Sequence, residues 1–149
     1  MEAFWDTSAV MKLYVNEPDA RPFRRLARAP ESLLISIFTL HELHCGLHRK
    51  ESQKALRPGM AEVLYESFRE KVKGEFFRLI TYDARVEQHA LEVIQRCYSA
   101  GQPVFLRVLD ALQLASALAA GATEIVSSDT RMRQGAALFG IKLLPQPAG

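Results

Sequence analysis

The chain has 149 residues, 48% of them hydrophobic and 24% charged, which is enough for one compact domain with a sizeable core and cramped for two. Its formal net charge of +2 permits a polyanionic partner without demanding one. The N-terminus lacks a basic region followed by a long apolar run, and no stretch approaches about 18 uninterrupted apolar residues, so we expect a cytoplasmic protein without a membrane span.

Strands and helices alternate along the first half of the chain. A short strand over residues 2–5 runs into Asp6-Thr7-Ser8, after which apolar residues recur at helical spacing. A short basic helix is expected over residues 20–29, a strand over 33–37 and a helix over about 39–50. Residues 51–74 have a mixed pattern, in which Pro58-Gly59 precedes a further amphipathic helix.

The second half continues the alternation. Strands are expected over residues 77–81, 124–127 and 142–144, and helices over 84–99, 106–120 and 130–139. The helix over 106–120 is apolar on nearly every side and stops at Gly121, so it belongs in an interior. This order predicts an α/β fold with three layers (α/β/α) and a central parallel sheet of four to five strands.

The two cysteines, Cys45 and Cys97, fall in predicted helices and lack the Cys-x-x-Cys spacing. We therefore expect two buried free thiols rather than a disulfide or a metal site. Such thiols suit a reducing cytoplasm.

Four acidic residues stand where a ligand is expected. Asp6 and Asp129 each follow a predicted strand, and ligands in open α/β sheets bind outside the carboxyl ends of the strands. Asp110 lies near the start of the apolar helix, and Glu42 borders the buried stripe of the helix over 39–50. Each has an ordinary interpretation alone: two N-caps, one acid favoured by a helix dipole and one solvated side chain.

Taken together, the four acids favour a metal site. They would converge if the first and fourth strands were neighbours at the centre of the sheet. Four carboxylates cannot share a dry cleft without a cation, and without one at least one folded-state pKa should rise through their repulsion. Hard oxygen ligands suit Mg²⁺ or Mn²⁺, and phosphodiester cleavage is the chemistry that such a site serves.

Three histidines mark another flank of the Glu42 helix. On a helical wheel His41, His44 and His48 fall together, opposite Glu42, at a spacing that could in principle hold a transition metal. The run His41-Glu42-Leu43-His44 is not the metalloprotease spacing, which needs two histidines four residues apart. Solvated or interface histidines are the ordinary interpretation.

The chain resembles the PIN-domain ribonucleases, and most closely the VapC-type toxins of bacterial toxin–antitoxin pairs. The resemblance covers residues 4–144 and depends on four segments in order rather than on any one of them. These segments are FWDTSAV with Asp6, SIFTLHELHCGL with Glu42, LRVLDALQLASA with Asp110 and IVSSDTRM with Asp129.

The resemblance implies a single PIN domain over residues 1–149, with the first and fourth strands adjacent. It also implies metal-dependent endonucleolytic cleavage of RNA, a homodimer and inhibition by a small cognate antitoxin. Thr7 or Ser8, together with Ser127, would be hydroxyls that orient the metal or its waters. Ser127 stands where many relatives carry Thr, and the three histidines are not part of the family pattern.

The resulting hypothesis is that Asp6, Glu42, Asp110 and Asp129 are catalytic and bind one or two Mg²⁺ or Mn²⁺ ions. Such ions activate a water and stabilise the leaving oxygen of an RNA phosphodiester. Basic side chains would hold the RNA backbone. The candidates are Arg24, Arg25, Arg49, Lys50, Arg131 and Arg133.

Two other functions stay open at this point. One is a non-toxin PIN-domain nuclease or phosphoesterase that acts on another nucleic acid, because carboxylate metal chemistry is common to all of these. The other is a PIN-like protein that binds without catalysis, although the loss of one acid would be its expected signature. The sequence does not distinguish RNA targets or identify an antitoxin.

Overall fold

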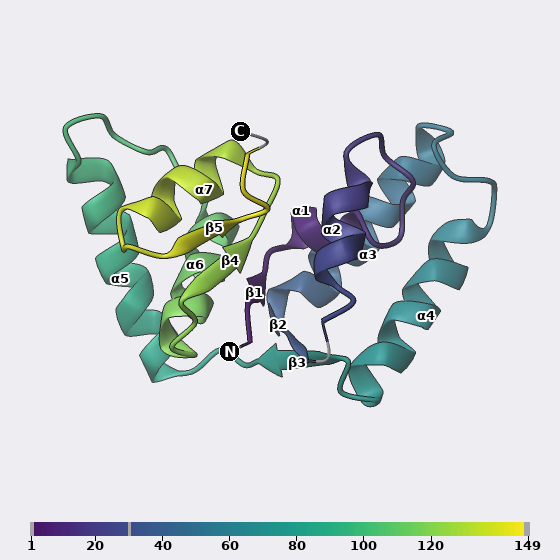
Figure 1. The fold of residues 1–149 in the computed structure, drawn as a ribbon, viewed down its shortest axis with the longest axis horizontal. Coiled ribbons are helices and arrows are strands. Elements are labelled where there is room, and N and C mark those ends of the chain that lie inside the picture. Colours follow the sequence, from purple (N-terminus) through teal and green to yellow (C-terminus); the bar gives the residue numbers. More distant parts are fainter. Residues whose placement is uncertain (1, 30, 148–149) are drawn as a thin grey trace.

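The protein is built on a five-stranded parallel sheet with the strand order β3-β2-β1-β4-β5, seen in a computed structural model that describes residues 2–29 and 31–147 (Figure 1). The strands are β1 (Phe4–Trp5), β2 (Leu33–Ser36), β3 (Phe77–Ile80), β4 (Glu124–Val126) and β5 (Lys142–Leu144). The first and fourth strands are neighbours, since Phe4 pairs with Ile125 and Trp5 with Val126. The predicted parallel α/β sheet is confirmed.

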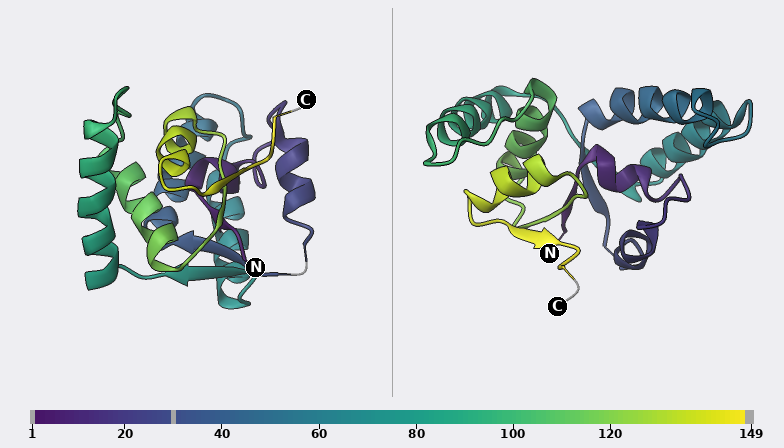
Figure 2. Two further views of the ribbon diagram at one scale, coloured as in Figure 1. Left: turned by 60° about the vertical axis from the view of Figure 1, so that its left-hand side comes forward. Right: turned by 90° about the horizontal axis from the view of Figure 1, so that it is seen from above.

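Helices follow the strands along the chain and cover both faces of the sheet. They are α1 (Thr7–Met11), α2 (Ala20–Leu26), α3 (Phe38–Ser52), α4 (Met60–Lys73), α5 (Ala84–Ser99), α6 (Val108–Ala119) and α7 (Thr130–Ala137). Figure 2 shows α5, α6 and α7 gathered on one side of the molecule and α1 to α4 on the other.

Two apolar clusters follow from this arrangement, because successive residues of a strand point to opposite faces. Phe4 and Ile125 pack with α5, α6 and α7, and Cys97 and Leu114 belong to the same cluster. Trp5 and Val126, the next residues along the same two strands, pack with α1, α2, α3 and α4. The central strand β1 therefore contributes one aromatic side chain to each half of the core.

Several predicted boundaries need correction. The apolar helix begins at Val108 rather than at residue 106, since Arg107 occupies its N-cap in an extended conformation. The basic helix α2 ends at Leu26, three residues early, and α7 ends at Ala137. Gly121 follows α6 with φ 71°, as expected of a glycine that stops a helix. The strands that were expected to end at residues 37, 81 and 127 each end one residue earlier, at Ser36, Ile80 and Val126.

One cysteine departs from the prediction. Cys97 is a buried free thiol, whereas the free thiol Cys45 is exposed. The reason is the direction of the buried stripe on α3, which runs through Thr39, Leu43 and Leu47 and leaves Cys45 facing solvent. None of the helices within the described ranges has the length and apolar character needed to cross a membrane.

Candidate active site

Asp6 is a buried carboxylate at the carboxyl end of the central strand. It is 3% exposed and caps α1 by accepting a hydrogen bond from the backbone amide of Ala9 at 3.0 Å. Ser8 Oγ donates to Asp6 Oδ1 at 2.6 Å, and Ser127 Oγ donates to Asp6 Oδ2. Asp6 is therefore both an N-cap and a candidate site residue. The carboxylate that caps α1 also accepts hydrogen bonds from the two serine hydroxyls.

Burial raises the pKa of Asp6 from 3.8 to about 6. The negative charge of Asp129 adds to this rise, while hydrogen bonds from Ser127, Ser8 and the Ala9 amide oppose it. The expected rise is present, but its main cause is loss of hydration and not the repulsion between acids.

Asp129 lies three residues beyond the end of the neighbouring strand β4, at the N-cap of α7, and its charge acts on Asp6. Its side chain caps α7 by accepting from the amide of Met132 at 3.0 Å, and its own amide donates to Ser127 Oγ at 3.0 Å. The Ser127 hydroxyl thus connects the two acids, since it also donates to Asp6. This contact needs β1 and β4 to be neighbours in the sheet.

Glu42 reaches the site from α3. Its Oε1 accepts hydrogen bonds from Thr7 Oγ1 at 2.9 Å and from Gln113 Nε2 at 2.7 Å. A close approach of α1 to α3 makes this possible, because a Cβ at Gly46 would lie 2.5 Å from Cε of Met11. A solvated surface acid, the ordinary interpretation of Glu42, does not describe a side chain held in this way.

Asp110 completes the set from the first turn of α6. Partial burial raises its pKa, and the charges of Asp129 and Glu42 raise it further. The backbone of Arg107 and its guanidinium charge act in the opposite direction. Asp110 is thus electrostatically coupled to two of the other three acids.

All four acids line one cavity of about 420 Å³ at the carboxyl ends of β1 and β4. Thr7, Ser8 and Gln113 line it as well. Among the described residues of this lining, Arg107 alone carries a positive charge, so the negative charge is not balanced by the protein. This excess of carboxylate oxygens fits a hard divalent cation such as Mg²⁺ or Mn²⁺.

The spacing of the acids also bears on how a cation would be held. In the described part of the chain, three donor atoms of His, Cys, Asp or Glu come within 4.8 Å of one another only at a histidine cluster elsewhere. In this side-chain arrangement no three of the four carboxylates, all of which lie in the described ranges, have donor atoms that close to one another. Mg²⁺ tolerates this, since it usually keeps several waters and contacts one or two carboxylates.

A model of the PIN domain family matches residues 3–138, which is most of the chain. The chain belongs to the PIN domain family. By sequence, no curated protein matches it.

Solved structures share the fold of this PIN domain at low sequence identity. FitAcB from Neisseria gonorrhoeae is 15% identical with a TM-score of 0.67, and 95% of each chain is covered. VapBC2 from Rickettsia felis, bound to a DNA fragment from their promoter, is 15% identical with a TM-score of 0.67 over 96% of this chain and 97% of that one. Mycobacterium tuberculosis VapC20, a sarcin-ricin loop cleaving toxin, is 20% identical with a TM-score of 0.65 over 89% and 94%.

A second hollow of about 590 Å³ adjoins the acidic cavity of this PIN domain and shares Glu42 and Arg107 with it. Arg49 and Lys50, two of the six predicted backbone contacts, line it together with Lys12. Lys12 is engaged with Glu17 at 2.6 Å and Asp19 at 2.7 Å. Basic side chains thus stand on one side of the acids.

The other predicted basic contacts lie elsewhere. Arg24 and Arg25 belong to a separate arginine group on α2, and Arg131 is exposed at the start of α7. Arg133 is committed to the fold, because its guanidinium donates to the backbone oxygens of Ser127, Leu144 and Pro145.

The three histidines do not form one group. His44 and His48 meet Glu62 of α4, whereas His41 lines the second hollow beside Glu42. The helical wheel wrongly grouped His41 with the other two histidines, because it describes α3 as an isolated helix. It takes no account of α4, which brings Glu62 to His44 and His48.

Gln113 is the residue that sequence reasoning missed. It is 2% exposed, and its Nε2 donates to Thr39 Oγ1 at 2.9 Å and to Thr7 Oγ1 at 3.0 Å, besides Glu42. Its signal in the sequence was a long polar side chain in the middle of an apolar helix. A buried amide nitrogen needs acceptors, and here those acceptors are Glu42 and the threonines beside it.

Proposed function

We propose that this protein is a Mg²⁺- or Mn²⁺-dependent endoribonuclease and the toxin of a toxin–antitoxin pair. The observation that carries the proposal is one cavity into which four separate elements bring Asp6, Glu42, Asp110 and Asp129. A member of the PIN family with this complete acid set is expected to cleave phosphodiesters.

In this proposal the four acids hold the cation, which when bound would activate a water and stabilise the leaving oxygen. The chain's own part is to fix the carboxylates. Ser8 and Ser127 hold Asp6 by donating to both of its oxygens, and Thr7 holds Glu42. These hydroxyls orient the acids toward the cavity before any cation binds.

The names of the structural neighbours support an RNA substrate and a protein inhibitor. One is a toxin that cleaves the sarcin-ricin loop, and another is a toxin–antitoxin complex from Klebsiella pneumoniae. Arg49, Lys50 and Arg107 would contact the RNA backbone on its way to the acids. Two free thiols and an RNA substrate agree with action in the cytoplasm.

The proposed homodimer has a candidate surface on α5 and at the start of α6. Large apolar side chains are exposed there, including Phe105 at 62% and Val108 at 70%. Ile94 and Tyr98 line a shallow hollow beside Val108. An exposed apolar patch of this kind favours a protein partner. Light scattering should give the mass of a dimer, and a monomer at every concentration would remove this part of the proposal.

The deciding experiment is an assay on RNA and DNA strands of matched sequence in EDTA, Mg²⁺ or Mn²⁺. Internal cleavage of RNA, only with a divalent cation, is the expected result. Cleavage of DNA alone would identify a different phosphodiesterase. No cleavage of either strand, under conditions where the protein binds them, would identify a non-catalytic binding protein.

A further inference from the structure

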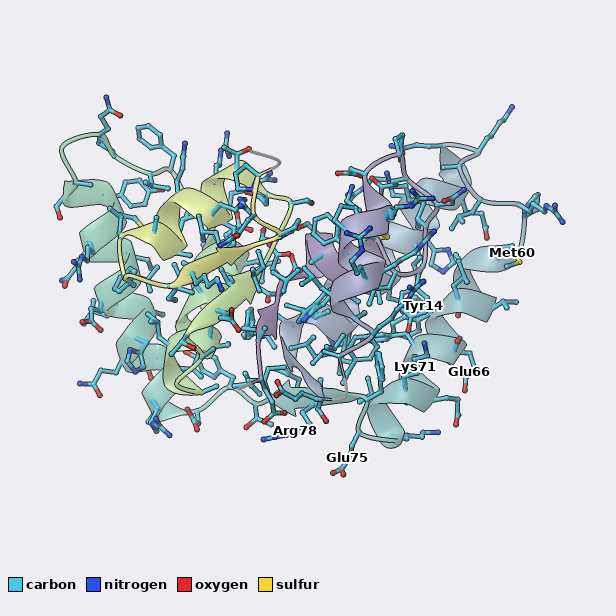
Figure 3. The ribbon with its side chains drawn as sticks, in the orientation of Figure 1. Tyr14, Met60, Glu66, Lys71, Glu75 and Arg78 are labelled. Atoms are coloured by element: carbon cyan, nitrogen blue, oxygen red, sulfur yellow. The ribbon has the colours of Figure 1, made fainter. Side chains whose placement is uncertain are left out.

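Two histidines of α3 and one glutamate of α4 form a cluster that the nuclease proposal does not use. His44 Nε2 lies 2.6 Å from Glu62 Oε2, and His48 Nε2 lies 2.7 Å from the same oxygen. The histidines are one helical turn apart on α3, and Glu62 lies in the first turn of α4, at the end marked by Met60 in Figure 3. One donor atom from each of the three lies within 4.8 Å of the other two.

The orientation of the cluster is fixed by aromatic packing. The ring of Tyr65 stacks on His44 with centroids 3.8 Å apart and an angle of 3° between the planes. Tyr65 follows Glu62 by three residues on α4, so the same helix face supplies the carboxylate and the ring that holds the imidazole. Tyr65 therefore holds the ring of His44, and the ring of His48 lies beside that of His44 with centroids 5.3 Å apart.

The cluster is separate from the acidic cavity and open to solvent. None of its three residues lines that cavity or the adjoining basic hollow. The side chains of His44, His48 and Glu62 are 36%, 51% and 64% exposed, so an ion can reach them without unfolding any part of the protein.

We infer that His44, His48 and Glu62 form a site for a divalent transition metal of the Zn²⁺ class, which joins α3 to α4. Zn²⁺ takes imidazole nitrogen and carboxylate oxygen at about 2.0–2.2 Å, and three protein ligands with one water is a common set. Tetrahedral bonds of that length need donors roughly 3.3 Å apart, so the exposed Glu62 has to retreat by less than about 1 Å.

The ligand types distinguish this site from the acidic cavity. Imidazole favours Zn²⁺, Ni²⁺ and Cu²⁺, whereas carboxylates and waters favour Mg²⁺ and Mn²⁺. The protein thus has one site for hard cations and one for borderline cations. Metal that binds only the folded cluster should stabilise the fold by mass action, through a link between two helices that pack on each other.

The test is a calorimetric titration of untagged protein with Zn²⁺ in a large excess of Mg²⁺, together with thermal melts. The excess of Mg²⁺ occupies the acidic cavity and competes poorly for imidazole. We expect one equivalent of Zn²⁺ to bind and the melting temperature to rise. His48→Gln and Glu62→Gln should each weaken Zn²⁺ binding by at least roughly tenfold and remove the rise.

Two matched variants make the result decisive. His41→Gln changes the same residue type on the same helix but outside the cluster, and Asp129→Asn changes the acidic cavity. Both should bind Zn²⁺ as the wild type does. The proposal is overturned if wild type binds no Zn²⁺ in excess Mg²⁺, if His41→Gln loses as much affinity as His48→Gln, or if Asp129→Asn abolishes binding. None of these three outcomes depends on nuclease activity.

Discussion

The two flanks of α3 carry two clusters of potential metal ligands with opposite physical properties. On one flank Glu42 joins three other acids around a cavity, and one of these, Asp6, is buried. On the other flank His44 and His48 meet Glu62 at an exposed surface. The same helix therefore serves both clusters, with Glu42 on the sheltered side and His44 and His48 on the open side.

The electrostatics of the two clusters differ in how each would respond to a cation. Around the cavity, burial and neighbouring charges raise the pKa values of Asp6 and Asp110, so ionisation there is unfavourable until a positive charge arrives. In the histidine cluster the hydrogen bonds from His44 and His48 lower the pKa of Glu62. The side chains of that cluster already hydrogen-bond to one another without an ion. A metal there would add a link between α3 and α4, whereas a cation in the cavity would offset unfavourable negative charge.

The largest expected effect comes from Asp129→Asn. Asparagine keeps the helix cap but removes the charge, so the fold should persist while cleavage falls by far more than roughly 100-fold. Asp6→Asn should act alike. Asp83→Asn is the matched control, because Asp83 caps α5 outside the cavity and should keep full activity. Full activity in purified Asp129→Asn would contradict the proposed mechanism.

A smaller loss is expected for Gln113→Leu. The buried amide donates to Glu42 and to the threonines around it, so its removal should reduce cleavage by about 10–100-fold and raise the Mg²⁺ concentration needed for half-maximal rate. Melts and circular dichroism check the fold. A purely structural role for Gln113 would change the melting temperature and leave the Mg²⁺ dependence where it was.

The third prediction concerns pH. The unfolded Asp6 carboxyl ionises near 3.8, whereas the folded one holds its proton until about 6, so the folded state binds more protons between those values. The free energy of unfolding in EDTA should therefore fall from about pH 4 to about pH 6, by on the order of 3 kcal/mol. Melts across this range measure it. The same slope in Asp6→Asn would assign the effect to another group.

A more modest gain in stability is expected for Asp110→Asn. This variant removes a partly buried charge whose pKa is raised by burial and by Asp129, so in EDTA at neutral pH it should melt above wild type. It should gain less from Mg²⁺ and cleave nothing. A variant that is destabilised in EDTA and still stabilised by Mg²⁺ as strongly as wild type would show Asp110 to be a helix-start acid only.

The smallest effect is expected when His41, His44 and His48 are all replaced by Gln. Cleavage that depends on Mg²⁺ should stay within a few-fold of wild type, because none of the three hydrogen-bonds to the four acids in the described structure. His41 is the sensitive member, since it lines the hollow beside Glu42. A complete loss of cleavage would mean that the two flanks of α3 work as one site.

The sequence predicted those features that depend on local pattern. Asp6 and Asp129 each follow a short apolar strand and cap a helix, and both the strand and the cap are visible in a few residues. That β1 and β4 are neighbours entered only through the resemblance, because strand pairing across more than a hundred residues leaves no local mark.

The rest depended on tertiary packing. Glu62 meets His44 and His48 only because the turn through Gly59 brings α4 back along α3. A raised pKa of at least one of the four acids was expected from their repulsion. Burial is the main cause of the rise at Asp6, and burial is a property of the assembled core. The hydrogen bonds of Gln113 join three elements and could not be inferred from α6 alone.

The hydrogen bond from Ser127 to Asp6 spans 121 residues of sequence, and it has a consequence for protein synthesis. A nascent chain that has emerged only as far as α6 already contains three of the four acids but not β4, which pairs beside Asp6. The site therefore cannot form until most of the chain has left the ribosome. A chain truncated before residue 124 should therefore be inactive, because it contains three of the acids but lacks the strand that carries the fourth to them.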